Sequence, residues 1–242
     1  YALAADLTPR QLLQRLRDGR AIQYRVTLVE GWNMRQLRAA LAAADPLEHQ
    51  TGDMDDAALM AALGHPGQHP EGRFLPETYA YQRGDSDLAI LRRAHAAMAQ
   101  ALDEAWQGRA DDVPLATPDE ALVLASIVEK ETGQAHERPQ IAGVFARRLR
   151  KGMLLQTDPT VIYGLGSGYD GNIRKRDLTT DTPYNTYTRV GLPPTPIAMP
   201  GRAALQAAVN PAPGDALFFV SRNDGSHVFS ATYAEHNRAV DC

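Results

Sequence analysis

The sequence predicts an α+β protein, with a small N-terminal βα module followed by a mostly helical domain that carries a C-terminal β-hairpin. Three observations lead to this prediction. Residues 21–29 alternate apolar and polar side chains, as a half-buried strand does, and residues 34–44 follow with the apolar spacing of a helix. Residues 117–131 are apolar on nearly every side of a helix, which indicates a helix buried in a core. Residues 216–230 hold two β-rich runs around an Asn-Asp-Gly turn, which is typical of a hairpin.

Composition places the chain among soluble globular proteins. Its 242 residues, 44% apolar and 22% charged, suffice for one large domain or two small ones. The 25 basic residues are outnumbered by 29 acidic ones, so a broad basic surface for nucleic acid is excluded and a neutral or zwitterionic polymer is a better expectation. The single cysteine, Cys242, can form neither an internal disulfide nor a cysteine metal site. No run approaches the roughly 18 apolar residues of a membrane span, and no signal peptide is visible.

The first elements follow from their capping residues and their spacing. A Thr-Pro pair opens a short amphipathic helix over residues 8–17. The strand over 21–29 comes next, and a Glu-Gly turn follows it. Asn33 then caps the helix over 34–44. These elements make up the predicted N-terminal module.

A connection rich in Asp, Gly, Pro and His follows over residues 45–70, and it can hold one short helix over 55–63. Its histidines, His49, His65 and His69, raise the possibility of a metal site. The last two are each followed by Pro, and no acidic partner recurs at a regular spacing. We therefore expect a solvated connection and no metal site.

The helical domain follows this connection. Residues 71–81 carry aromatic side chains that we expect to pack between the module and the domain, and residues 85–107 form a long helix with His95 at the edge of the core. After the central helix, residues 138–151 form another. Most of its basic side chains are expected to face solvent: Arg147, Arg148, Arg150 and Lys151.

The last third of the chain begins with loops. Residues 164–200 are rich in Gly, Thr and Pro, so loops and short helices are expected there rather than a sheet. A helix over 202–210, the hairpin and a closing helix over 232–240 complete the chain. His227 and His236 are expected in structural roles, although His227 follows the hairpin turn and can face a cleft.

The central helix carries the first candidate for catalysis. Thr117 and Glu120 mark its start as a capping box does. Near its end Glu129 shares a face with apolar residues, whereas Glu131 lies about 200° further around the helix. A carboxyl group in apolar surroundings holds its proton more tightly and can act as a general acid. The alternative is a Glu that is solvated or paired with Lys130 or a nearby arginine, and helix position alone leaves both interpretations open.

Six stretches then point to a family. They are Glu71-Gly-Arg-Phe-Leu-Pro-Glu-Thr-Tyr79, Ala125-Ser-Ile-Val-Glu-Lys-Glu-Thr132, Val144-Phe-Ala-Arg-Arg-Leu149, Leu155-Gln-Thr-Asp-Pro-Thr-Val-Ile-Tyr-Gly164, Pro183-Tyr-Asn-Thr-Tyr187 and Gly191-Leu-Pro-Pro194. In this order they closely resemble the MltG (YceG-like) family of endolytic murein transglycosylases. The resemblance covers the chain from about residue 25 to the C-terminus, and two of the runs are too long and unusual for chance agreement.

The resemblance implies an organisation and a location. Residues 1–70 are expected to form a LysM-like module and its connection, and residues 71–242 the YceG-like catalytic domain, with the 71–81 stretch as one wall of its cleft. An ordinary βα unit docked on the larger domain is the alternative for the module. Family members resemble single-pass inner-membrane proteins with a periplasmic body, so we expect this chain to be that body on the periplasmic face, without its N-terminal anchor.

The resemblance also implies a reaction and a site. Glu129 would protonate the β-1,4 glycosidic oxygen between N-acetylmuramic acid and N-acetylglucosamine within a glycan strand and then deprotonate the muramoyl C6 hydroxyl, giving a 1,6-anhydro end. This cleavage would limit strand length during wall synthesis. Ser126, one turn before Glu129, would orient the acid. The expected substrate contacts lie in the most family-like stretches: Gln156, Asp158, Tyr163, Asn185 and Tyr187. No cofactor and no metal are expected.

Several alternatives stay open. Asp158 can instead cap a short helix over residues 160–164, and Arg147 or Arg148 can reach Glu129 or Asp158. A lysozyme-like hydrolase would use Asp158 as a second carboxylate or to position water. A non-catalytic glycan-binding scaffold for cell-wall synthases would bind strands without cutting them. A pyridoxal-phosphate lyase, a label also attached to this family, would need a Schiff-base lysine and a phosphate site that nothing in the sequence singles out.

Overall fold

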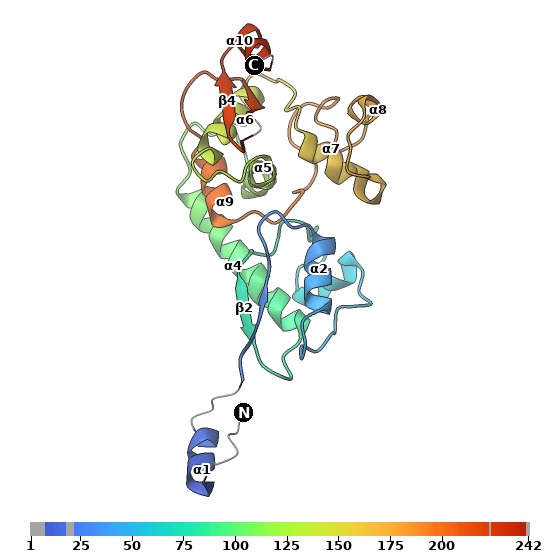
Figure 1. Ribbon diagram of the computed structural model, residues 1–242, viewed down its shortest axis with the longest axis vertical. Coiled ribbons are helices and arrows are strands. Elements are labelled where there is room, and N and C mark those ends of the chain that lie inside the picture. The colour runs from blue at the N-terminus through green and yellow to red at the C-terminus, as the bar shows by residue number, and fades with distance from the viewer. Residues whose placement is uncertain (1–7, 18–21, 223, 241–242) are drawn as a thin grey trace.

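The computed structural model describes residues 8–17, 22–222 and 224–240, and Figure 1 shows an elongated molecule with the N-terminal module below the helical domain. The elements in chain order are α1 (Pro9–Arg17), β1 (Tyr24–Thr27), α2 (Met34–Ala42), α3 (Asp56–Leu63), β2 (Thr78–Tyr81), α4 (Asp87–Gln107), α5 (Pro118–Glu131), α6 (Arg138–Arg150), α7 (Asp158–Leu165), a 3₁₀ turn (Gly166–Gly168), α8 (Lys175–Thr179), α9 (Arg202–Val209), β3 (Phe218–Ser221), β4 (His227–Ser230) and α10 (Tyr233–Val240). The predicted α+β class is confirmed.

The N-terminal module is a strand–helix–helix–strand unit. Its strands β1 and β2 pair antiparallel, with Val26 opposite Tyr79. Helix α2 begins at a capping box in which Asn33 and Gln36 satisfy N–H groups that lack partners inside the first turn. Both strands and both helices bury side chains in one apolar cluster around Phe74.

Strand β2 was not predicted, because it is only four residues long. Its aromatic side chains were expected to pack between the module and the domain without forming a strand. Its pairing with β1 crosses the predicted domain boundary at residue 70. The first half of α4 belongs to the same apolar cluster through Ile90, Leu91 and Ala94. Helix α4 continues from this cluster into the core of the helical domain, so one helix serves both parts of the molecule.

Helix α5 lies at the centre of the helical domain, as its all-round apolar surface predicted. It packs against α4, α6, α7 and α9, and every side chain from Ala121 to Val128 is buried. Thr117 caps the helix by accepting a hydrogen bond from the Glu120 N–H, and Pro118 occupies the first turn. Because these neighbours surround α5, its middle is buried and its two ends emerge from the core.

Helix α6 holds the C-terminal hairpin in place. Arg148 is 7% exposed and donates to the backbone oxygens of Leu217 and Leu155 at 2.7 and 2.8 Å. Arg147 donates to the backbone oxygens of Ala216 and Ala212. The expectation that these two arginines face solvent is therefore wrong. Backbone carbonyls without strand partners make partly buried sites for guanidinium groups that sequence spacing cannot reveal.

The segment between α6 and α9 forms a lobe of loops, α7 and α8, which lies to one side of α5 and α6 in Figure 1. This agrees with the expectation of loops and short helices. The lobe and the hairpin face each other across the C-terminal end of α5. The candidate site is built from these three parts.

The module joins the helical domain through backbone hydrogen bonds. The Gly31 N–H donates to the Met199 oxygen at 2.9 Å, and the Met199 N–H donates to the Trp32 oxygen at 2.7 Å. Lys130 adds a contact at 3.3 Å from its Nζ to the Gly31 oxygen. The Glu-Gly turn after β1 therefore lies against the end of α5.

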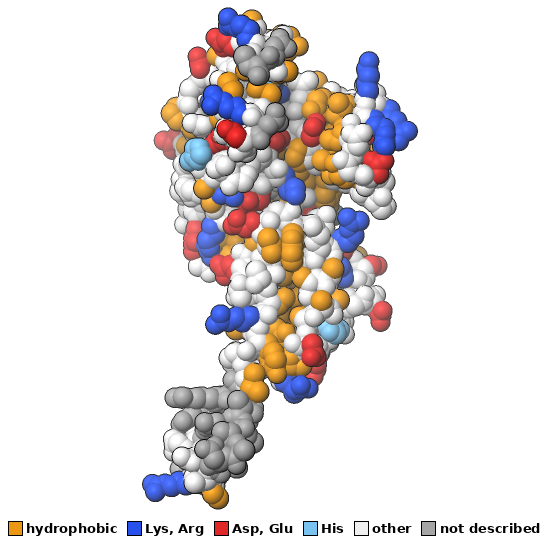
Figure 2. Space-filling view, in the orientation of Figure 1, with side chains coloured by type: hydrophobic (Ala, Val, Ile, Leu, Met, Phe, Trp, Pro, Cys, Tyr) orange, Lys and Arg blue, Asp and Glu red, His pale blue; other side chains and the backbone are white. Residues whose placement is uncertain are grey.

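Surface features agree with the composition. On the face shown in Figure 2, acidic and basic side chains are interspersed among neutral ones. No helix in the described part of the chain is long and apolar enough to cross a membrane. Two features noted in the sequence, Cys242 and Asn223 of the hairpin turn, lie outside the described residues.

Candidate active site

Glu131 is the last residue of α5, and its carboxyl group enters a cavity of about 210 Å³. The helix ends there because Thr132 adopts an extended conformation. The Thr157 hydroxyl donates to Glu131 Oε1 from the segment before α7. Thr157 is itself buried and held by Thr186, so this donor is fixed in place.

The cavity gathers residues from five separate stretches of the chain. They are Glu131 from α5, Arg148 from α6, the stretch that enters α7 with Leu155, Gln156 and Asp158, Tyr187 from the lobe, and Phe219 from β3. Three of the five predicted substrate contacts, Gln156, Asp158 and Tyr187, thus lie together around one carboxyl group. Tyr187 donates from its hydroxyl to Asp158 Oδ1 at 2.6 Å.

Burial raises the pKa of Glu131 from 4.5 to about 7, because the carboxylate loses solvation in the cavity. The Thr157 hydroxyl opposes this shift, and the charge of Asp158 adds to it. His227 and Arg148 favour the charged form. The position at the C-terminal, negative end of the α5 dipole also disfavours a carboxylate. Glu131 can therefore both hold and release a proton near neutral pH.

Asp158 does not cap α7 in the predicted way. It is the first helical residue, Thr157 occupies the cap position, and no side chain makes a cap hydrogen bond there. The Asp158 carboxylate instead turns toward Tyr187 and the cavity. The alternative interpretation of Asp158 as a helix cap is therefore wrong.

Gln156 has a backbone conformation that residues other than glycine rarely adopt. Its φ is 51°, in the left-handed region where a Cβ atom costs about 1–2 kcal/mol. The Gln156 N–H donates to the Thr186 oxygen at 3.0 Å, and Arg148 Nη1 lies 3.4 Å from the side-chain oxygen. Strain of this kind is often kept where a side chain must point into a functional site.

Glu129 does not lie in the apolar surroundings that the sequence pattern predicted. Arg138 Nη2 donates to Glu129 Oε1 at 3.0 Å, and the Gly201 N–H donates to Oε2 at 2.9 Å. The Glu129 side chain is only 5% exposed. The Arg138 guanidinium also lies 3.7 Å from the Glu30 carboxylate of the module. The prediction of an apolar site is wrong, because the helix face of Glu129 meets Arg138 and a backbone N–H at the module contact. The alternative, pairing with an arginine, is what the structure contains, although that arginine is neither Arg147 nor Arg148.

The polar side chains of Ser126 and Asn185 are buried and hydrogen-bonded to backbone groups. Ser126 is fully buried, donates to the Val123 oxygen and accepts from the Ile197 N–H, so it does not orient Glu129. Asn185 is 1% exposed, and its amide donates to three backbone oxygens, of Asp177, Leu178 and Thr180. These contacts organise the lobe and leave the amide no free donor, which contradicts the predicted sugar contact.

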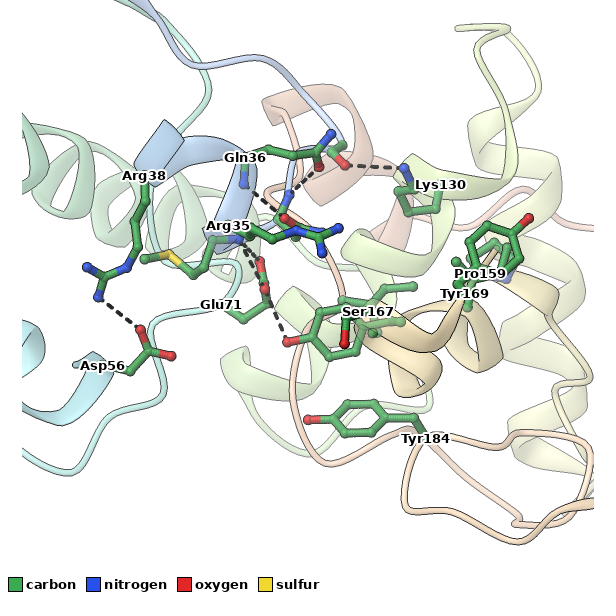
Figure 3. Close-up of a pocket in the computed structure, with 17 residues that line it drawn as sticks. Arg35, Gln36, Arg38, Asp56, Glu71, Lys130, Pro159, Ser167, Tyr169 and Tyr184 are labelled. Carbon is green, nitrogen blue, oxygen red and sulfur yellow. Dashed lines mark hydrogen bonds and ion pairs between the residues drawn. The ribbon is translucent and has the colours of Figure 1, made fainter. Parts of the chain in front are cut away.

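Tyr163 lies in a second and larger cavity, of about 810 Å³, between α2 of the module and α7 of the lobe. Its hydroxyl donates to Glu71, which is labelled in Figure 3, at 3.1 Å. Glu71 is 3% exposed and also accepts from the Met34 N–H at the start of α2. Burial raises the pKa of Glu71 to about 7. Of the stretch 71–81, which was expected to form one wall of the cleft, Glu71 lines this larger cavity.

His227 supports the hairpin wall of the site. Its Nδ1 lies 2.7 Å from Glu137 Oε2, its N–H donates to Glu137 Oε1, and its ring packs edge-on against Phe219. Glu137 also accepts a hydrogen bond from Thr132, the residue after Glu131. Within the described residues, no group of three or more His, Cys, Asp or Glu side chains could hold a metal ion.

Sequence reasoning considered both acids and preferred Glu129, whereas Glu131 is the one that lines the cavity. A helix that is apolar all round does not reveal which of its last side chains meets an open cavity. The available signal was position, since the final residue of a buried helix is the one most able to leave the core. Arg148 was missed as a cavity residue, because a basic run at the end of a helix is usually solvated.

Comparison with known proteins finds relatives along the whole chain. The YceG-like family matches residues 1–242. A Bacillus subtilis (strain 168) protein named endolytic murein transglycosylase is 31% identical over 258 residues, which cover all of this chain and 71% of that relative. A Streptococcus pneumoniae (serotype 2, strain D39) protein of the same name is 31% identical over 176 residues, which cover 70% of this chain but 31% of that relative. A crystal structure of a yceG-like protein from Listeria monocytogenes matches with a TM-score of 0.72 and 29% identity, over 95% of this chain and 80% of that one.

Proposed function

Because the chain belongs to the YceG-like family, we propose that it is an endolytic murein transglycosylase that cleaves the glycan strands of peptidoglycan. Two relatives of that name, each 31% identical to the chain, support this activity. The observation that carries the mechanism is the carboxyl group of Glu131. It lies in a cavity, and burial there raises its pKa to about 7. An acid of this kind is what cleavage of a glycosidic bond requires.

Glu131 acts twice in the proposed reaction. Its protonated carboxyl group donates the proton to the glycosidic oxygen between N-acetylmuramic acid and N-acetylglucosamine, so the C1–O bond breaks and N-acetylglucosamine leaves as an alcohol. The resulting carboxylate takes the proton of the muramoyl C6 hydroxyl, and that oxygen bonds to C1. The product is a 1,6-anhydro end, no water is consumed, and Glu131 regains its proton. One carboxylate therefore serves as both acid and base.

The neighbouring groups fit supporting roles. The Asp158 carboxylate raises the pKa of Glu131 and can stabilise the positive charge that develops at C1 in the transition state. The hydrogen bond from Tyr187 keeps that carboxylate in position. Gln156 offers amide groups to sugar hydroxyl and N-acetyl groups from its fixed, strained backbone. We propose these three as substrate contacts and Tyr163 as part of the neighbouring cavity wall.

The two acids at the end of α5 provide the test. Glu131→Gln keeps the size of the side chain but cannot release a proton, so we expect cleavage of purified sacculi to fall at least about 1,000-fold with the fold intact. Glu129→Gln should keep measurable cleavage, because Glu129 is engaged by Arg138 and Gly201. If Glu129→Gln is inactive while Glu131→Gln still cuts, the acid is Glu129 and the assignment to Glu131 fails. Circular dichroism of both variants checks that each is folded.

A lysozyme-like hydrolase remains the second candidate, because Asp158 places another carboxylate in the cavity of Glu131. The products separate the two reactions. Hydrolysis leaves a reducing muramic acid, which borohydride reduces, whereas transglycosylation leaves the 1,6-anhydro sugar, which borohydride does not. Mass spectrometry of the cut ends therefore decides between them.

The remaining family expectations belong to the same proposal. The order strand, helix, helix, strand supports a LysM-like module, and its contact with the end of α5 supports a role close to the cut. Since peptidoglycan lies outside the cytoplasmic membrane, we propose that the domain works there, on the periplasmic face, held by a membrane anchor. We further propose that cleavage limits glycan strand length beside the cell-wall synthases.

A further inference from the structure

The larger cavity lies beside the proposed catalytic residues along the same two chain segments. Lys130 lines the larger cavity and precedes Glu131, and Pro159 lines it and follows Asp158. Its volume of about 810 Å³ is in the range of cavities that bind a small ligand. A group bound in this cavity would therefore lie next to the proposed catalytic cavity.

The two long walls of this cavity differ in chemistry. The lobe supplies Pro159, Ile162, Tyr163 and Tyr169, which are apolar or aromatic. Helix α2 and the end of α5 supply polar and basic groups: Asn33, Arg35, Gln36, Arg38 and Lys130. Figure 3 shows Arg35 extending from α2 across the space toward the lobe.

Two cations in the cavity lack an acidic partner among the residues that the structure describes. Arg38 is paired with Asp56 at 3.0 Å, and Glu71 is satisfied by the Met34 N–H and the Tyr163 hydroxyl. Within the part of the chain that the structure describes, no carboxylate lies within ion-pair distance of Arg35 or Lys130. Lys130 makes one hydrogen bond, to the Gly31 oxygen. Since burial raises the pKa of Glu71 to about 7, its carboxyl group is mostly uncharged below that pH and adds little negative charge.

We propose that this cavity binds the stem peptide of the murein strand, with Arg35 and Lys130 holding its carboxylates. The inference rests on the proposed function, because it names the part of the substrate that the larger cavity takes. N-acetylglucosamine carries no charge and needs no cation. The stem peptide carries several carboxylates and hangs from the muramic acid ring whose C1–O bond breaks. Arginine and carboxylate form strong charge-assisted hydrogen bonds, and the apolar wall suits the methyl and methylene groups of such a peptide.

The test compares two forms of one substrate. Uncross-linked glycan strands that carry stem peptides are prepared, and half are stripped of peptides with an amidase. We expect wild type to have a higher kcat/KM on peptide-bearing than on stripped strands. The ratio of the two values should fall about tenfold in Arg35→Ala and further in Arg35→Glu, while Arg35→Lys keeps most of it. Arg25→Ala is the matched control, since Arg25 is an exposed arginine of the same module outside the cavity, and it should leave the ratio at the wild-type value.

The outcomes separate failure of this inference from failure of the proposed function. If wild type cuts both strands equally, or if Arg35→Ala keeps the wild-type ratio, the peptide site is refuted while the transglycosylase assignment stands. If wild type cuts neither strand, the proposed function fails and the inference falls with it. Inorganic phosphate serves as a further probe. If phosphate inhibits cleavage of stripped strands through Arg35 while peptides have no effect, the cavity binds a phosphate and the stem-peptide proposal is overturned.

Discussion

The carboxyl group of Glu131 combines two demands that ordinarily conflict. It must be protonated to start the proposed reaction and charged to finish it. Burial in the cavity raises its pKa to about 7, while the Thr157 hydroxyl and the nearby Arg148 keep the charged form accessible. The balance of these groups places both forms within reach near neutral pH.

This balance predicts how activity depends on pH. Because the free enzyme must carry the proton on Glu131, kcat/KM should fall as the pH rises through about 7, by about tenfold per unit well above that value. Asp158→Asn removes a charge that raises the pKa of Glu131, so it should shift this decline to lower pH. Initial rates on soluble glycan strands between pH 3.5 and 9 measure both effects. A decline near pH 4.5 in wild type would show that Glu131 is not held as the structure indicates.

The strained backbone of Gln156 predicts a separation of stability from activity. Glycine adopts a φ of 51° without a Cβ penalty, so Gln156→Gly should unfold at a free energy within about 1 kcal/mol of wild type. Gln156→Ala keeps the strain and loses the side-chain contacts, so it should be the less stable of the two by about 1 kcal/mol. Both variants lack the amide and should cleave strands at least about tenfold more slowly. Urea unfolding and strand cleavage are measured side by side, and full activity in Gln156→Gly would remove Gln156 from the site.

Sequence reasoning preferred an acid two residues away from the one that lines the cavity. It singled out the motif that contains Glu129 and Glu131, and Gln156, Asp158 and Tyr187 do lie around one of the two carboxyl groups. The choice between the acids depends on Arg138 and the Gly201 N–H, which meet Glu129 only in the folded chain. No periodicity in α5 itself carries that information.

At the scale of elements, α6 connects the core to the hairpin wall of the cavity. Arg148 is the main link, since it reaches the backbone of Leu217 on one side and of Leu154 and Leu155 on the other. Its guanidinium also lies 5.2 Å from the centre of the Phe218 ring. This one side chain therefore ties β3 to the segment that leads into α7.

Removing this link should destabilise the protein. Arg148→Ala leaves several buried carbonyls without donors, and we expect the free energy of unfolding to fall by about 3 kcal/mol. Arg150→Ala is the matched control, because its arginine lies on the same helix in an exposed pair with Asp112 and should cost less than about 1 kcal/mol. Thermal unfolding of the two variants gives the comparison. Equal losses would mean that Arg148 is no more structural than an exposed arginine.

Most helices were predictable because capping residues and apolar spacing are local signals. The predicted helices at residues 55–63 and 85–107 lie within two residues of α3 and α4. Strand β2 and the surroundings of Asn185 were not predictable in this way. The strand is defined by its pairing with β1, and the Asn185 amide by three backbone oxygens of a loop that has no repeating pattern.

At the scale of the whole molecule, a charge network joins the module to the helical domain. Arg138 contacts Glu129 of α5 and Glu30 of the module, and Gly201 lies so close that a Cβ atom there would collide with the Glu30 carboxylate. Glu129 is central to this junction. Through Arg138 and the Gly201 N–H it contacts the groups that join the two parts of the molecule.

The two Glu→Gln variants should consequently change stability in opposite directions. At pH 8, Glu129→Gln leaves the Arg138 guanidinium without its closest charged partner and should lower the free energy of unfolding by about 2–4 kcal/mol. Glu131 has a raised pKa in the folded state, so it stabilises the fold fully below about pH 4.5 and loses this contribution as the pH rises toward 7. Glu131→Gln removes that penalty and should be about 1–3 kcal/mol more stable than wild type at pH 8, and no more stable at pH 4. Urea unfolding at both pH values tests this, and a stabilised Glu129→Gln would mean that the ion pair does not form in solution.

The contact between the Trp32 and Met199 backbones has a consequence for synthesis of the chain. A ribosome makes the module and α5 first, yet the loop with Met199 that docks beside them follows much later, and Phe219 closes the cavity later still. Contacts between segments so far apart in sequence form late in folding. A nascent chain therefore carries the acid of α5 long before that acid is shielded from water. Cutting activity would arise only at the end of folding, which delays the appearance of an enzyme that breaks the wall of its own cell.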